Sequence, residues 1–273
     1  MKSYLKLALS GAIIVLLMLL PAPRLLAASP LEFTAALEQS FNKTVAKAKE
    51  DDKTVLQTGF RSISSLHQEE QNQETKVKSM HLSNESTQQL LNKKIQEIGK
   101  SRISQLEREL SQTKARYQPL LDLYTSLNRR ITSAKRLKDK DLNAILKTQA
   151  EGMKVAVQLA RAEIKLKQQM LSEAKQARTQ QVKKAKGMLS PITSYKSKIK
   201  SEKSRLSTVA KRTGTHWKDF KQALRKTDPS AAARTLNALT ADLKQLVQHQ
   251  QNLVSYEQQI ADLLQKARQS VPA

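Results

Sequence analysis

The chain has no cysteine, and it is poor in glycine and in aromatic residues. Among its 273 residues there are six glycines, four phenylalanines, five tyrosines and one tryptophan. The absence of cysteine excludes disulfides, thiolate metal sites, cysteine nucleophiles and cysteine-linked lipid anchors. Glycine falls well below its usual share of ~7%. This argues against sandwiches, barrels and doubly wound sheets, because their turn-rich loops need glycine. Few aromatics and many Lys, Gln, Leu and Ala instead predict long helices.

Residues 1–28 have the pattern of a secretory signal peptide. Lys2 and Lys6 give a basic start, residues 7–20 form an apolar run, and small residues up to Ala28 offer a cleavage site. An uncleaved membrane anchor would need ~20 apolar residues, and this run is shorter. We expect cleavage after residue 27 or 28 and export to the cell envelope or secreted space, with no transmembrane segment in the mature chain.

Heptad spacing of apolar residues is the clearest signal in the sequence. Two runs, 103–134 and 236–267, alternate by three and four residues without a slip, which is typical of a coiled coil or a long helical bundle. Polar Gln250 and Glu257 stand within the second run, where we expect them to fix register or partner. The apolar seam positions are Ile103, Leu106, Leu110, Tyr117, Leu120, Tyr124, Leu127, Ile131, Leu236, Leu239, Leu243, Leu246, Leu253, Ile260 and Leu264.

These signals predict an all-α fold, an elongated antiparallel coiled coil or long helical bundle after the signal peptide. An N-terminal helix is expected over 29–60, where Gly59 interrupts it. A long hairpin is expected over 61–212 with its turn near 136–141, where Asp139 or Asp141 can cap the next helix. A short helix and a C-terminal heptad helix are expected over 213–273.

Three further details of this organisation follow from single residues. Pro119 falls inside the first seam, and because the seam keeps its phase there we expect a kink and no reversal. A turn is predicted at Gly214, and Asp228 with Pro229 is a favourable start for the last helix. The helix after the hairpin turn is expected to pack through one apolar face: Leu142, Ile145, Ala156, Leu159, Leu166 and Met170.

Positive charge is the other outstanding property of the chain. Lys and Arg number 48 against 24 Asp and Glu, a net charge of +24, and 16 basic against three acidic residues lie within 152–212. Such a stripe attracts polyanions over long distances in a salt-sensitive way. Two interpretations stay open: a surface for an anionic envelope polymer, or a solvated helix face. The candidate polyanion-binding residues are Lys175, Arg178, Lys183, Lys184, Lys186, Lys196, Lys198, Lys200, Lys203 and Arg205.

Motifs for catalysis or for cofactor binding are missing from the sequence. It contains no Gly-rich phosphate loop, no G-x-S-x-G elbow and no H-E-x-x-H metal pattern. His67 shares a helix face with Glu70 and Glu74, a pattern that surface coincidence explains better than a metal site. We therefore expect no enzyme, cofactor or metal site. We also expect no nucleic-acid partner, because no aromatic residues are interleaved with the basic ones.

The sequence thus favours an exported, non-catalytic coiled-coil protein with a structural or interaction role. Its heptad seams would mediate self-association or contact with a protein partner, and its basic face would bind an anionic polymer. The alternative is an envelope chaperone that holds unfolded clients between basic helical arms. That design resembles in architecture, with no shared motif, the small periplasmic Skp-type chaperones, which are also basic and helical.

Overall fold

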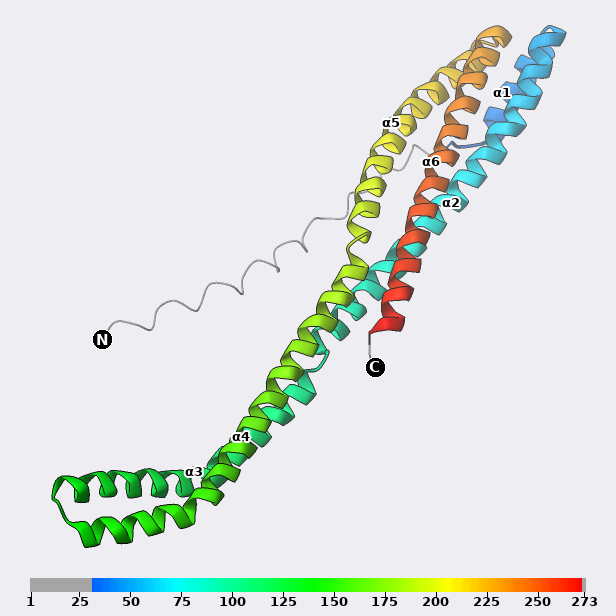
Figure 1. Cartoon of the computed structure of the whole chain (residues 1–273). Coiled ribbons are helices and arrows are strands. Elements are labelled where there is room, and N and C mark those ends of the chain that lie inside the picture. Colours follow the sequence, from blue (N-terminus) through cyan, green and yellow to red (C-terminus); the bar gives the residue numbers. More distant parts are fainter. Residues whose placement is uncertain (1–30, 272–273) are drawn as a thin grey trace. The chain divides into compact units, whose positions relative to one another are not determined.

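The computed structural model describes residues 31–271, and it confirms the all-α class. Every regular element over these residues is a helix, and none of them forms a strand. The predicted signal peptide, residues 1–28, lies outside the described residues. The helices, labelled in Figure 1, are α1 (Ala35–Ala46), α2 (Glu50–Glu97), α3 (Lys100–Arg136), α4 (Lys140–Leu189), α5 (Ile192–Arg225) and α6 (Pro229–Ser270).

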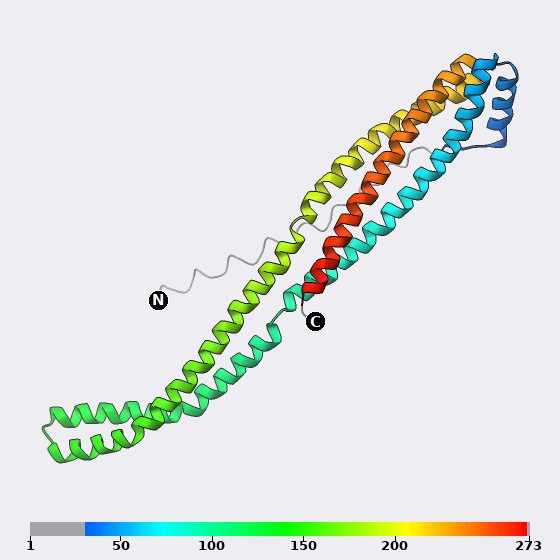
Figure 2. The ribbon, with the colours of Figure 1, turned by 45° about the vertical axis from the view of Figure 1, so that its right-hand side comes forward.

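The first of two compact units contains the described residues up to Ser83 together with Thr193–Ala261. It holds α1, most of α2 and α6, and nearly all of α5, and Figures 1 and 2 show α2, α5 and α6 lying side by side. The apolar seam of α6 forms much of its core, because residues at the three-and-four spacing fall on one helix face. The seam residues of α6 in this unit, each at most 3% exposed, are Leu236, Leu239, Leu243, Leu246, Leu253 and Ile260.

All four phenylalanines and the only tryptophan of the chain meet in this first unit. Phe33 lies 5.7 Å from Phe60 and 5.5 Å from Trp217, measured between ring centroids. Phe60 stacks on Phe41 at 4.2 Å and contacts Phe220 at 6.5 Å. Aromatic rings bury much apolar area, so this cluster ties α1 and the segment before it to α2 and α5. Nothing in the helical periodicity of the separate segments predicted this convergence.

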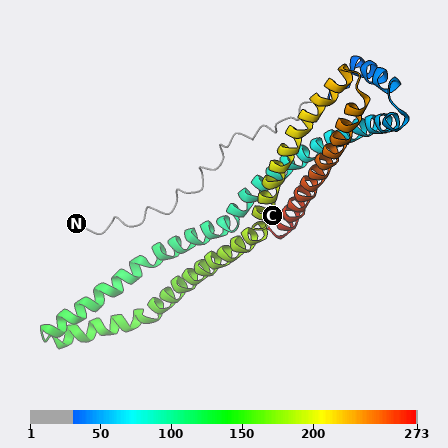
Figure 3. The same ribbon diagram turned by 90° about the horizontal axis from the view of Figure 1, so that it is seen from above.

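The second unit contains Asn84–Ile192 and the end of α6, and its main feature is the antiparallel hairpin of α3 and α4. Three residues, 137–139, join the two helices, which lie side by side in all three ribbon views (Figures 1–3). Asp139 caps α4, since its Oδ1 accepts a hydrogen bond from the backbone N–H of Leu142 at 3.0 Å. The first seam is buried or half-buried along α3. Near the turn the core consists of Leu127, Ala134, Leu146 and Ala150.

A left-handed glycine and an arginine define the junction between α2 and α3 in this unit. Gly99 has φ +69°, a conformation that side chains with a Cβ rarely adopt. Arg178 reaches across from α4, where its Nε donates to the carbonyl of Ile98 at 2.9 Å and its Nη2 to that of Gln96 at 3.2 Å. These bonds satisfy carbonyls at the end of α2 that the helix itself leaves free. The sequence prediction had placed no helix boundary here.

Two predicted breaks are wrong. Gly59 lies within α2 and Gly214 within α5, which continues to Arg225 before the chain reverses at 226–228. A helical glycine costs only about 1 kcal/mol, and packing can offset that cost. Gly59 is needed where it is, because a Cβ there would lie 2.7 Å from Leu236 Cδ2 of α6. Pro119 is accommodated inside α3, with no reversal.

The predicted packing face of α4 also needs correction. Leu142, Ile145, Leu159 and Leu166 are 39–66% exposed, and Ala156 is exposed as well. α4 has apolar residues on two adjacent faces, and periodicity alone does not determine which of them meets α3. The buried face is the one that carries Leu146, Ala150, Val157 and Ala160.

Candidate functional site

Each of the four histidines lies against a buried or largely buried carboxylate in the first unit. Only His67 and its partner Glu70, both on α2, are close in sequence. The other three histidines pair with residues far away in the chain, so the sequence could not predict these partners. No group of three or more potential metal ligands occurs over the described range 31–271. The pairs, measured from ring Nδ1 to carboxylate oxygen, are His67–Glu70 at 3.9 Å and, at 2.8 Å each, His81–Glu257, His216–Asp242 and His249–Glu202.

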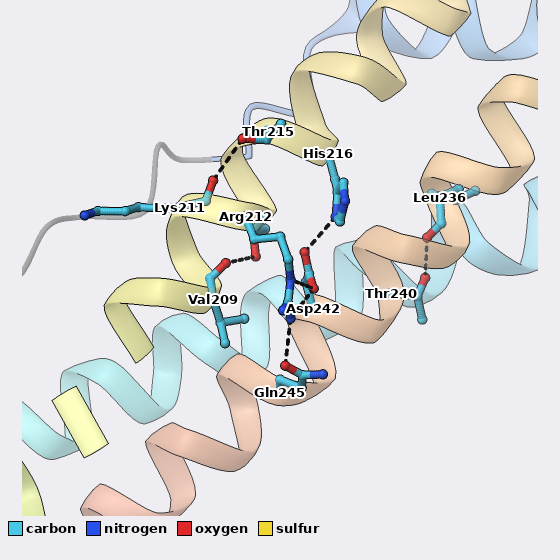
Figure 4. A network of polar contacts seen from close by, with 10 residues as sticks. Val209, Lys211, Arg212, Thr215, His216, Leu236, Thr240, Asp242 and Gln245 are labelled. Carbon is cyan, nitrogen blue, oxygen red and sulfur yellow. Dashed lines mark hydrogen bonds and ion pairs between the residues drawn. The ribbon is translucent and has the colours of Figure 1, made fainter. Parts of the chain in front are cut away.

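Asp242 of α6 is the centre of the network drawn in Figure 4, and only 3% of the residue is exposed. Its Oδ1 accepts from Arg212, with Nε at 2.7 Å and Nη2 at 2.6 Å, and its Oδ2 accepts from His216 Nδ1 at 2.8 Å. Arg212 Nη2 also donates to Gln245 Oε1 at 2.7 Å. Buried charge is tolerated only when it is paired and hydrogen-bonded, and this carboxylate meets both conditions. The network therefore fastens α5 to α6.

Glu202 of α5 forms a second such network. It accepts hydrogen bonds from His249 Nδ1 at 2.8 Å and from Asn252 Nδ2 at 2.6 Å, both on α6. Arg205 lies 3.3 Å away on the same helix. Burial by itself would raise the pKa of Glu202, but the bonds from Asn252 and His249 and the nearby positive charges outweigh it and lower that pKa. The ionised form is thus favoured in the folded state.

The two polar positions predicted within the second seam are buried and face α2. Gln250, 2% exposed, has its Nε2 3.4 Å from Glu70 Oε1, and Glu257, 1% exposed, accepts from His81. Burial raises the pKa of Glu70, partly countered by the bond from Gln250. A polar pair inside an apolar seam matches only one alignment of two helices. These contacts accordingly set the register of α6 on α2.

The ten candidate basic residues are divided between two helices. Half of them lie on α4 in the second unit and the other half on α5 in the first. Two of the α4 residues support the fold: Lys175 pairs with Glu107 of α3 at 2.8 Å, and Arg178 holds the end of α2. The α4 set is Lys175, Arg178, Lys183, Lys184 and Lys186, and the α5 set is Lys196, Lys198, Lys200, Lys203 and Arg205.

Ion pairs between α3 and α4 use three of the eight acidic residues of the hairpin, Glu107, Glu109 and Glu163. Arg116 Nη2 lies 2.5 Å from Glu163, and Lys167 Nζ lies 2.7 Å from Glu109. Hydrogen bonds from Tyr117 and Arg116 lower the pKa of Glu163, against the effect of desolvation. Similarly, the bond from Lys167 lowers the pKa of Glu109. These acidic residues fix the alignment of α3 with α4. The hairpin still carries many more basic than acidic residues.

A basic triplet near the end of α4 stays open to solvent. Lys183, Lys184 and Lys186 are exposed, and none of them forms an ion pair with another described residue. Over residues 100–189 there are 21 basic against eight acidic residues, a net charge of +13. The hairpin therefore presents a strongly positive surface on which this triplet is the densest cluster of α4.

Comparison with protein-family models, with characterised proteins and with solved structures finds no match for this chain. No helix within residues 31–271 is both long and apolar enough to cross a membrane.

Proposed function

We propose that the protein is an exported, non-catalytic helical interaction protein of the cell envelope or secreted space that binds anionic polymers through basic helix faces. Export rests on the signal-peptide pattern of residues 1–28. The observation that carries the binding role is the net charge of +13 over 100–189, with Lys183, Lys184 and Lys186 exposed. Several lysines on one rigid helix attract a polyanion through summed contacts.

Polymer binding is tested by titrating the mature chain with long-chain polyphosphate and with poly-L-glutamate at several salt concentrations. Changing Lys183, Lys184 and Lys186 to glutamine should weaken binding and flatten its salt dependence. By analogy with nucleic acids, each lost contact lowers the slope of log affinity against log salt by about 1. Helicity should be kept, because glutamine and lysine have similar helix propensities.

The matched control changes three exposed α2 lysines, Lys76, Lys93 and Lys94, to glutamine. It removes the same charge from a region where basic and acidic residues are nearly balanced, so binding should change much less. If both triplets behave alike, or if the wild type binds neither polymer at 50 mM salt, the proposal is wrong.

A chaperone role is the second candidate, and the exposed apolar flank of α4 favours it. Val155, Leu159 and Leu166 are 56–66% exposed on a basic hairpin, a surface able to contact unfolded chains. Stoichiometric suppression of citrate-synthase aggregation, lost when these three residues become glutamine, would support this role. Unchanged suppression by that variant, or none by the wild type, would refute it.

A further inference from the structure

The turn of the α3–α4 hairpin exposes large apolar side chains. Leu137, in the turn itself, is 78% exposed, and Ile145, in the second turn of α4, is 58% exposed. Leu142, between them in sequence, is 39% exposed. Figures 1 and 3 show that within the second unit only α3 and α4 extend to this end. The packing of the second unit does not require these exposed apolar side chains at the hairpin turn.

The hairpin closes without these side chains. Its core near the turn is made by Leu127, Ala134, Leu146 and Ala150, with Ile131 packed against them and its carbonyl accepting from Asn143 Nδ2 at 3.0 Å. Asp139 caps the start of α4, because its side chain accepts a hydrogen bond from the backbone N–H of Leu142. Leu137 and Ile145 can therefore be exchanged for polar residues with little effect on folding.

The segment that carries these exposed apolar side chains is rich in positive charge. Residues 129–147 contain seven basic and two acidic residues, a net charge of +5. One of the two acids, Asp139, is already used as the helix cap. The basic residues are Arg129, Arg130, Lys135, Arg136, Lys138, Lys140 and Lys147, all exposed.

We propose that this hairpin tip, residues 129–147, docks on anionic lipid membranes. Leu137 and Ile145 would enter the boundary between headgroups and acyl chains, while the surrounding Lys and Arg contact lipid phosphates. Interfacial binding of this kind needs both buried apolar area and attraction to anionic lipid, and the tip supplies both. Long basic side chains keep their charge at headgroup level while their stems lie along apolar surface. Charge complementarity thus selects an anionic bilayer as the partner.

The convex shape of the tip favours a lipid surface over a folded protein partner. A flat bilayer interface accepts a protruding leucine without any preformed pocket, whereas a protein would need a matching cavity. The proposal does not rest on polymer binding by Lys183, Lys184 and Lys186, because these lysines lie near the opposite end of α4.

The experiment uses flotation of the mature chain with vesicles of phosphatidylcholine containing 30% phosphatidylglycerol, and with pure phosphatidylcholine, at 100 mM salt. The wild type should bind the anionic vesicles and barely bind the neutral ones. The double change Leu137→Gln and Ile145→Gln should reduce binding by at least about tenfold, because each buried methylene adds to interfacial affinity. The matched control, Leu123→Gln and Leu159→Gln, removes apolar side chains that are 59% and 66% exposed elsewhere on the hairpin, and it should bind like the wild type.

Because the chain has no cysteine, a single Leu137→Cys change allows a polarity-sensitive dye to be placed at the tip. Its emission should shift to the blue when anionic vesicles are added, and a dye at Leu159→Cys should not respond. The Lys183, Lys184 and Lys186 triplet variant should still bind vesicles, which separates a failure of this proposal from a failure of polymer binding. The proposal is overturned if the wild type does not float with anionic vesicles, if tip and control variants bind equally, or if polyphosphate is bound and vesicles are not.

Discussion

Replacing Asp242 with alanine should destabilise the first unit by about 2–3 kcal/mol. The change removes an acceptor that holds Arg212 and His216 and leaves both donors without their partner. Loss of one member of a fully buried ion pair costs about 3–5 kcal/mol. Here the Arg212 side chain is 44% exposed and can bind water instead, so the smaller figure is expected.

Urea unfolding followed by the fluorescence of Trp217 measures this cost directly. Trp217 is the only tryptophan of the chain, is 3% exposed and lies beside His216, so its emission reports the first unit. The midpoint should fall by about 1 M with the slope m unchanged. Asp219→Ala is the matched control, because Asp219 is exposed on α5 and the same exchange there alters only helix propensity and surface charge. Equal midpoints for the two variants would show that the network adds nothing to stability.

Gly99→Ala should destabilise the second unit by about 1–2 kcal/mol, because Gly99 has a positive φ. Gly152→Ala should stabilise the unit by about 0.5–1 kcal/mol, because Gly152 is helical and an added Cβ would have no atom within 4 Å. Calorimetry that gives the same sign for both changes would refute this. Burial lowers the pKa of His67, so NMR titration of its ring should give a midpoint below ~6.5. The free energy of unfolding of the wild type, relative to that of His67→Gln, should fall as the pH drops from ~6.5 through that midpoint. Glu202 has a lowered pKa, so its stabilisation should be present above about pH 4.5 and lost as the pH falls through the folded pKa; a wild type and a Glu202→Gln variant with parallel acid-unfolding curves would contradict that.

The amino-acid sequence by itself determined the helical class and several helix ends. Three-and-four spacing specifies which face of α6 is apolar, and that face is buried in the structure. Local capping is likewise a property of adjacent residues, as at Asp139, and at Asp228, whose Oδ1 accepts from the N–H of Ala231 at 3.0 Å. These features depend on residues within one or two helical turns of each other.

The tertiary structure alone decided which faces meet and which polar groups pair. Two apolar faces of α4 compete, and only the alignment with α3 buries Val157 and leaves Leu159 exposed. Glycine has a low helix propensity, yet Gly59 lies within α2. The close approach of Leu236 leaves no room there for a Cβ, so the packing of α2 against α6 favours glycine at this position. Glu257 meets His81 across 176 positions of chain, and periodicity contains no information about such a distant partner. Heptad spacing sets an apolar stripe, whereas the partner and the register come from charge and shape matched between helices.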